Sequence, residues 1–308
     1  MNTIFVILYN KKLMTYVFKG VKDMKNKEIS VCSFNCQCAA GYANKSLLPI
    51  LDVVGAENLK TKSSVYIFNE LYKAKDFPKF KEKLKELDYI VVEDSRDAKR
   101  GENHVLVAID KELGVDIVEY IHSNSDSEQP DFLSILLKIN GEDYAIVGAR
   151  IKWHGQRVYN EKTGRYGYKI TEDTFKNRMT EFKFLMNHLD QLKERGIEKI
   201  IIGADWNTAK SRHPEGQELS EESIEAAYEG YLQKHYNYEK IKLAFEERGF
   251  FVVTPDNEIG SIRNKSGAIS AIKLDHIMVN FGDVVEAKYV FDQKGVSDHA
   301  MITAKIML

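Results

Sequence analysis

Hydrophobic residues fall into short runs bounded by polar residues along most of the chain. Runs at 29–35, 65–70, 88–94, 104–110 and 115–122 are rich in β-branched and aromatic residues, which is typical of strands. Two more, 131–139 and 143–151, flank Asn140-Gly141, a dipeptide that strongly favours a hairpin turn. Further runs at 199–207, 274–280, 284–291 and 300–307 complete a strand-rich chain.

Helical periodicity is confined to fewer segments. We expect helices at about 44–54, in the charged stretch 79–88, within 219–248, and over the long segment 171–195, which Gly196 ends. The apolar positions of the long helix are Phe175, Met179, Phe182, Leu185, Met186, Leu189 and Leu192. Strands and helices mixed in this way predict an α/β (α+β) protein.

The chain has 308 residues, of which 44% are hydrophobic, enough for one large domain or two smaller ones. Its net charge of -2 gives no general attraction for polyanions, so any phosphate-binding surface must be local. Met24 offers a second plausible start, and we expect residues 1–23 to be an N-terminal extension before a single domain at 24–308.

The apolar run at 4–9 is too short to cross a bilayer, and no basic segment precedes it as in a signal peptide. No basic amphipathic helix suggests membrane binding. We therefore expect a soluble, cytoplasmic protein without membrane association and without an obligate protein partner.

Three cysteines, Cys32, Cys36 and Cys38, lie within the stretch VCSFNCQC. A disulfide within an extended segment has poor geometry, and zinc would need a fourth ligand that no second cysteine pair supplies. Small core residues are the interpretation that we favour for Cys32 and Cys36. The informative residue of this stretch is Asn35, a polar amide where a buried strand ends.

Polar side chains stand at the ends of several predicted strands: Asn35, Glu70, Asp205, Asn207, Asp275, Asp298 and His299. Each of them alone is also typical of a turn or a helix cap. Gathered at one edge of packed sheets, they would form a cluster of hard oxygen ligands that suits Mg²⁺ or Mn²⁺.

In chain order, the segments SFNCQ, FNE, GADWN, KLDH and SDH resemble the motifs of the endonuclease/exonuclease/phosphatase family over about residues 28–307. The resemblance implies a four-layer sandwich of two packed mixed β-sheets flanked by helices. It also implies a Mg²⁺-dependent phosphodiesterase, with a nuclease acting on DNA or RNA as the first hypothesis. A hydrolase of small-molecule or lipid phosphoesters is the alternative, and a non-enzymatic binding protein is the third.

The roles implied by the resemblance follow residue by residue. Glu70, Asn35 and Asp298 would lie at the metal, Asp205 would activate water, and Asn207 would bind phosphate oxygens. His299, oriented by Asp275, would stabilise charge on the scissile phosphate. The cysteines have no part in this chemistry.

Two features depart from the family pattern. One extra residue separates Gly203 from Asp205, although the Asp-x-Asn spacing is intact. Arg150 stands where many relatives have a His or Tyr, and an arginine can contact phosphate but cannot act as a general acid. His154 could replace that function, or it is an ordinary loop residue.

The segment 151–169 follows Arg150 and carries five Lys or Arg residues and one acid, interleaved with aromatic residues. Basic groups can follow a phosphate backbone and aromatic rings can stack on bases. The substrate-binding candidates are Trp153, His154, Arg157, Lys162, Arg165 and Tyr166; aromatic packing within a solvated hairpin is the alternative. The segment Pro214–Gly230, with six Glu and no Lys or Arg, should lie away from a polyanionic substrate.

Overall fold

The structure is a computed structural model of the whole chain. It describes residues 5–9, 12–16, 28–36, 46–58, 63–71, 76–94, 104–123, 129–152, 156–160, 165–169, 172–211, 238–253, 255, 260–263, 269, 272–291 and 297–308.

Two six-stranded mixed sheets form the centre of the molecule. The first has the order β13-β14-β12-β9-β8-β7 and consists of β13 (Phe251–Val253), β14 (Ile272–Val279), β12 (Lys199–Ser211), β9 (Glu142–Arg150), β8 (Asp131–Ile139) and β7 (Val115–His122). The second has the order β15-β16-β3-β4-β6-β5 and consists of β15 (Asp283–Val290), β16 (Met301–Met307), β3 (Glu28–Asn35), β4 (Val65–Leu71), β6 (His104–Asp110) and β5 (Tyr89–Glu93).

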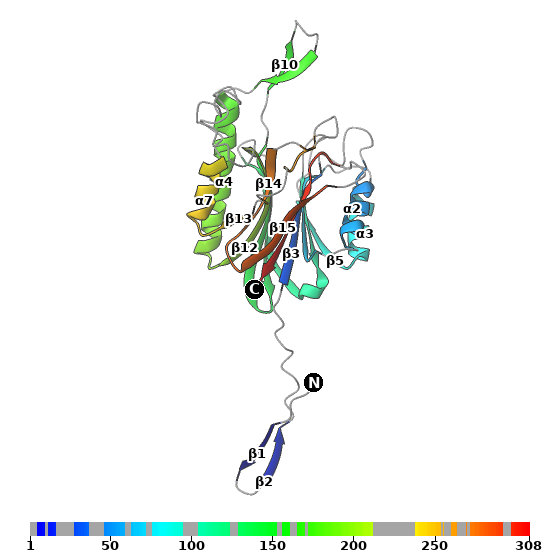
Figure 1. The fold of residues 1–308 in the computed structure, drawn as a ribbon, viewed down its shortest axis with the longest axis vertical. Coiled ribbons are helices and arrows are strands. Elements are labelled where there is room, and N and C mark those ends of the chain that lie inside the picture. The colour runs from blue at the N-terminus through cyan, green and yellow to red at the C-terminus, as the bar shows by residue number, and fades with distance from the viewer. Residues whose placement is uncertain are drawn as a thin grey trace.

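Helices cover the outer face of each sheet (Figure 1). The helices α4 (Glu172–Glu194) and α7 (Tyr238–Glu246) lie on the first sheet, and α2 (Leu48–Asn58) and α3 (Phe77–Glu86) lie on the second. A short 3-10 helix, η1 (Lys111–Leu113), links β6 to β7. The predicted sandwich of two packed mixed sheets flanked by helices is thereby confirmed.

Three apolar clusters correspond to the three interfaces between these four layers. The central cluster joins the inner faces of both sheets and includes Val31, Ile67, Ile135, Ile146 and Ile201. A second joins the first sheet to α4 and α7, and a third joins the second sheet to α2 and α3. Cys32 and Cys36 are buried in the third cluster, as the core interpretation predicted; Cys38 lies outside the described residues.

The two sheets lie close to each other at a pair of glycines. Gly148 of β9 and Gly203 of β12 are register partners, and both face the second sheet. A Cβ on Gly148 would lie 2.5 Å from Val105 Cγ1, and one on Gly203 would lie 2.8 Å from the Ser33 side chain. A side chain larger than hydrogen would clash at either position, two residues before Arg150 at the end of β9 and Asp205 within β12.

Most predicted elements are found with small shifts of their ends. Asn140 and Gly141 both have positive φ, 54° and 84°, as the predicted two-residue hairpin turn requires. Met179, expected on the buried stripe of the long helix, is instead 37% exposed. Of the helical region expected at 219–248, α7 lies in the described part; the acidic segment 214–230 lies outside it.

The N-terminal strands β1 (Phe5–Tyr9) and β2 (Lys12–Tyr16) pair antiparallel with each other and join neither six-stranded sheet. The division at residue 23 stays a prediction. None of the described helices is long and apolar enough to cross a membrane.

Candidate active site

A row of four charged residues crosses the first sheet at one edge. Asp131 of β8 is the register partner of Arg150 of β9, Arg150 is that of Asp205 of β12, and Asp205 is that of Asp275 of β14. Side chains alternate between the two faces of a strand. Each of these four residues lies two positions from an apolar residue or a glycine on the inner face of the sheet, so all four are on the inner face as well. The row therefore faces the space between the sheets.

Residues of the second sheet complete the site from the opposite side. Asn35 ends β3, Glu70 lies near the end of β4, and His299 lies two residues before β16. Asn35 Nδ2 donates to Asp205 Oδ2 at 2.8 Å and so links the two sheets. The predicted convergence of these strand-end residues is therefore present in the structure.

Asp205 is fully buried and accepts three hydrogen bonds. Besides Asn35, the donors are the backbone N and the Nδ2 of Asn207, at 2.7 Å to Oδ1 and 3.0 Å to Oδ2. Burial and the neighbouring Asp275 carboxylate raise the pKa of Asp205 to about 7. A carboxylate with such a pKa can accept a proton near neutral pH.

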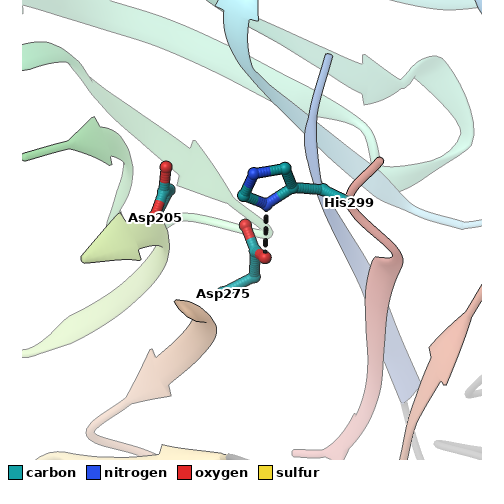
Figure 2. A group of neighbouring side chains, drawn as sticks. All are labelled: Asp205, Asp275 and His299. Atoms are coloured by element: carbon teal, nitrogen blue, oxygen red, sulfur yellow. Dashed lines mark hydrogen bonds and ion pairs between the residues drawn. The ribbon is translucent and has the colours of Figure 1, made fainter. Parts of the chain in front are cut away.

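His299 is oriented by Asp275. Its Nδ1 lies 2.8 Å from Asp275 Oδ2, and Figure 2 shows the ring held over this carboxylate with Asp205 beside it. Burial opposes the charged form of the imidazole, but Asp275, followed by Asp205 and Asp298, raises the pKa of His299 to about 10. The imidazole is therefore a cation at neutral pH, and its Nε2 lies 3.8 Å from Asp298 Oδ1.

Arg150 forms two ion pairs within the site. Its Nη1 lies 3.0 Å from Asp131 Oδ2, and its Nε pairs with Glu70 Oε1 from the facing sheet. Burial favours the neutral form of Glu70, but Arg150 and then His299 lower the pKa of this carboxyl below its ordinary value. Asp131 is a member of the site that the sequence did not suggest.

Two bulges set the backbone at this edge. The β4–β6 register shifts between Phe68 and Leu71, and the β12–β14 register shifts between Asp205 and Lys210. Glu70 and Asn207 lie in these bulges with φ of 53° and 49°. Regular alternation would place Glu70 on the outer face with Phe68; the left-handed bulge lets it meet Arg150 instead. Such strained residues concentrate at functional sites.

Helix α4 braces the strand ends with two buried charged residues. Arg178 is fully buried, and its Nη2 donates to the backbone oxygens of Trp206, at 3.3 Å, and Asn207. Glu181 accepts a hydrogen bond from the backbone N of Lys152 at 2.7 Å. Trp206 stacks on Phe245 with ring centroids 5.3 Å apart. The bulge that carries Asn207 is therefore held from the side opposite to the active site.

The donor set fits a divalent cation. Asp205 and Asp275 each offer a carboxylate oxygen within 4.8 Å of the other and of the His299 ring, and Glu70 and Asp298 lie close enough to affect the ionisation of Asp205 and His299. His299, as a cation, is not itself a ligand. Carboxylates outnumber the cationic groups Arg150 and His299, and burial raises the pKa of both Asp205 and Asp298. The site therefore has an excess of buried negative charge on oxygen atoms, which a bound Mg²⁺ or Mn²⁺ would neutralise. Glu70 and Asn35 as the main ligands stay a prediction.

The substrate-binding candidates are placed only in part. Trp153, His154 and Lys162 lie outside the described residues. Arg157 belongs to β10 (Gln156–Asn160), and Arg165 and Tyr166 belong to β11 (Arg165–Lys169). These strands pair antiparallel with each other and extend away from the two six-stranded sheets in Figure 1. Tyr159 is 54% exposed.

Solved structures with the same architecture have low sequence identity to this chain. No protein-family model and no curated protein sequence matches it. An endonuclease/exonuclease/phosphatase from Beutenbergia cavernae superposes with a TM-score of 0.64 at 12% identity, over 91% of this chain and 72% of that one. The chain has the endonuclease/exonuclease/phosphatase fold.

Two further structures of this fold carry informative ligands. TDP2 of D. rerio, solved with a single-strand DNA product, has a TM-score of 0.55 and 14% identity over 92% of this chain and 100% of that one. The catalytic domain of human Nocturnin, solved with a bound sulfate anion, has a TM-score of 0.56 and 12% identity over 90% of this chain and 93% of that one.

Proposed function

We propose that this protein is a divalent-metal-dependent phosphodiesterase that hydrolyses nucleic acid, with DNA as the first substrate. The observation that carries the proposal is the placement of Asp205, hydrogen-bonded to Asn35 and Asn207, beside the Asp275–His299 pair at one edge of the two sheets. This set combines a base, amide donors and a fixed cation, which in-line attack on a phosphodiester requires.

Each residue has a task in the proposed reaction. Asp205 removes a proton from the water whose oxygen bonds to phosphorus, while the bond from phosphorus to the leaving oxygen breaks and the departing alkoxide takes a proton from solvent water. Asp275 holds His299 through Nδ1, so Nε2–H can donate to a phosphate oxygen as negative charge develops there. A bound Mg²⁺ or Mn²⁺, held by Glu70, Asn35 and Asp298, would supply charge neutralisation at the phosphate.

A nucleic-acid substrate is supported by the hairpin β10–β11. In its register, Arg157 is opposite Tyr168 and Tyr159 is opposite Tyr166, so these four positions share one face. Aromatic and basic residues on one face of a hairpin suit a single-stranded nucleic acid, because its bases stack on aromatic rings and its phosphates attract basic groups. That TDP2 has been solved with single-strand DNA adds support from the same fold.

A substrate panel tests the proposal. Supercoiled plasmid, a single-stranded DNA oligonucleotide and RNA are incubated with Mg²⁺ or Mn²⁺, and an Asp205→Ala variant excludes contaminating nuclease. Metal-dependent cleavage that is absent in the variant supports a nuclease and identifies the preferred polymer. Failure to cleave any polymer, with cleavage of a small phosphodiester retained, would favour the alternative of a small-molecule or lipid phosphoesterase.

The basic residues of the hairpin are expected to set the salt dependence of binding. Changing Arg157, Lys162 and Arg165 together to Ala should weaken oligonucleotide binding and reduce the slope of log K against log salt by about 2, since each lost phosphate contact contributes about 0.7 with single strands. Fluorescence anisotropy measures the slope. The matched control changes Lys79, Lys83 and Lys85, which are exposed on α3. An equal effect in both variants would contradict the assignment.

Arg178 is expected to act as a positioning residue. Arg178→Met removes the donor that fixes the Asn207 carbonyl, so kcat should fall by about 10–10²-fold while KM changes less. Arg178→Lys should recover part of the rate. The exposed Arg195, which pairs with Glu119, provides the control Arg195→Met. Loss of thermal stability without a specific loss of kcat would show that Arg178 only supports the fold.

A further inference from the structure

Arg150 lies among three carboxylates. In the cross-strand row it stands between Asp131 and Asp205, and Glu70 approaches it from the facing sheet. Its side chain is only 13% exposed, and those of Asp131 and Glu70 are 5% and 12% exposed. A guanidinium cannot lose its proton in a protein, so this positive charge is permanent.

The three carboxylates around Arg150 are themselves suitable ligands for a divalent ion. Two-metal phosphoesterases hold their ions about 3.5–4 Å apart, bridged by oxygen ligands of this type. Here the guanidinium forms ion pairs with both Asp131 and Glu70. A divalent ion bound beside Asn35 and Asp205 would therefore compete with Arg150 for Glu70. The guanidinium therefore stands where a divalent ion could otherwise neutralise Asp131 and Glu70.

We propose that Arg150 is a tethered cation that fills the second cation position of this centre, so that the centre binds a single divalent ion. The inference rests on the proposed function, because it requires that a divalent ion binds at this edge at all. It also gives Asp131 a role: this carboxylate draws Arg150 towards β8 and limits its competition for Glu70.

Isothermal titration of the metal-free full-length protein with Mn²⁺ tests the inference without relying on activity. The wild type should bind one ion. Arg150→Met, which removes the charge but keeps an unbranched side chain, should bind two, because Glu70 and Asp131 then lack their cation. The double variant Arg150→Met/Asp131→Asn should return to one. A single ion with unchanged affinity in Arg150→Met, or two ions in the wild type, would overturn the inference.

A second variant covers the case in which Arg150→Met does not fold. In Asp131→Asn, Arg150 pairs with Glu70 alone, so the affinity for Mn²⁺ should fall by about 10-fold, in the range typical of groups next to metal ligands. Unchanged or tighter binding would contradict the inference. Glu70→Gln distinguishes a failure of the proposed function from a failure of the inference about Arg150. If Glu70→Gln binds Mn²⁺ as the wild type does, or if the wild type binds none, the proposed metal centre itself is wrong.

Discussion

Asp205→Asn is expected to reduce phosphodiester hydrolysis by about 10²–10⁴-fold, the usual contribution of a positioned general base. The amide keeps the shape of the side chain but cannot accept a proton from water. Asp205 is fully buried and its pKa is raised from 3.8 to about 7, so its ionisation lowers the stability of the metal-free protein; this cost grows as the pH rises from 3.8 and is complete above about 7. The variant also replaces one acceptor oxygen of Asp205 by an N–H donor, so circular dichroism is needed to establish that it is folded at the temperature of the assay.

The measurement is a single-turnover rate with saturating metal, together with circular dichroism of the metal-free variant. Asp116→Asn, an exposed substitution on β7, is the matched control and should leave the rate unchanged. Turnover in Asp205→Asn within a few-fold of the wild type would show that water is activated by another group.

His299→Gln is expected to lower the rate by about 10²–10³-fold, because a preorganised donor to the developing charge is lost. In the wild type, activity should rise as Asp205 deprotonates, at or below its pKa of about 7. It should fall at high pH as His299 loses its proton near its pKa of about 10. The alkaline limb should disappear in His299→Gln.

The substitution Asp275→Asn tests the Asp275–His299 pair in a second way, through the pH dependence of activity. Asp275 is the group that raises the pKa of His299, so its neutral replacement should shift the alkaline limb to lower pH. The exposed substitution Asp283→Asn on β15 should leave the pH profile in place. An alkaline limb at the same pH in Asp275→Asn and in the wild type would exclude His299 as the titrating acid.

The sequence predicts most of the fold because its strands are marked by local signals. Both β6 and β7 have the bounds that their apolar runs predict, and Asn140-Gly141 forms the expected turn. The four layers, in contrast, follow from the resemblance, since no local pattern states which helix covers which sheet.

The site residues were found where chemistry coincides with a strand end. Asp131 was missed although the signal was available: counting outward from the Asn140-Gly141 turn in the hairpin register leads to the pair Asp131–Arg150. The left-handed bulges at Glu70 and Asn207 carry no such signal, because neither residue is a glycine. Arg178 interrupts an apolar stripe of α4, which alone does not reveal that it meets the Asn207 carbonyl.

Hydrolysis of a phosphodiester oligonucleotide in ¹⁸O-labelled water tests the central claim most directly. The metal-free protein, the protein with Mg²⁺ or Mn²⁺ restored, and Asp205→Asn are compared by mass spectrometry of the product. We predict cleavage only with restored metal, one ¹⁸O atom in the product phosphate, and neither in Asp205→Asn. Cleavage that persists in the metal-free protein, or product without the label, would contradict metal-dependent hydrolysis at this site.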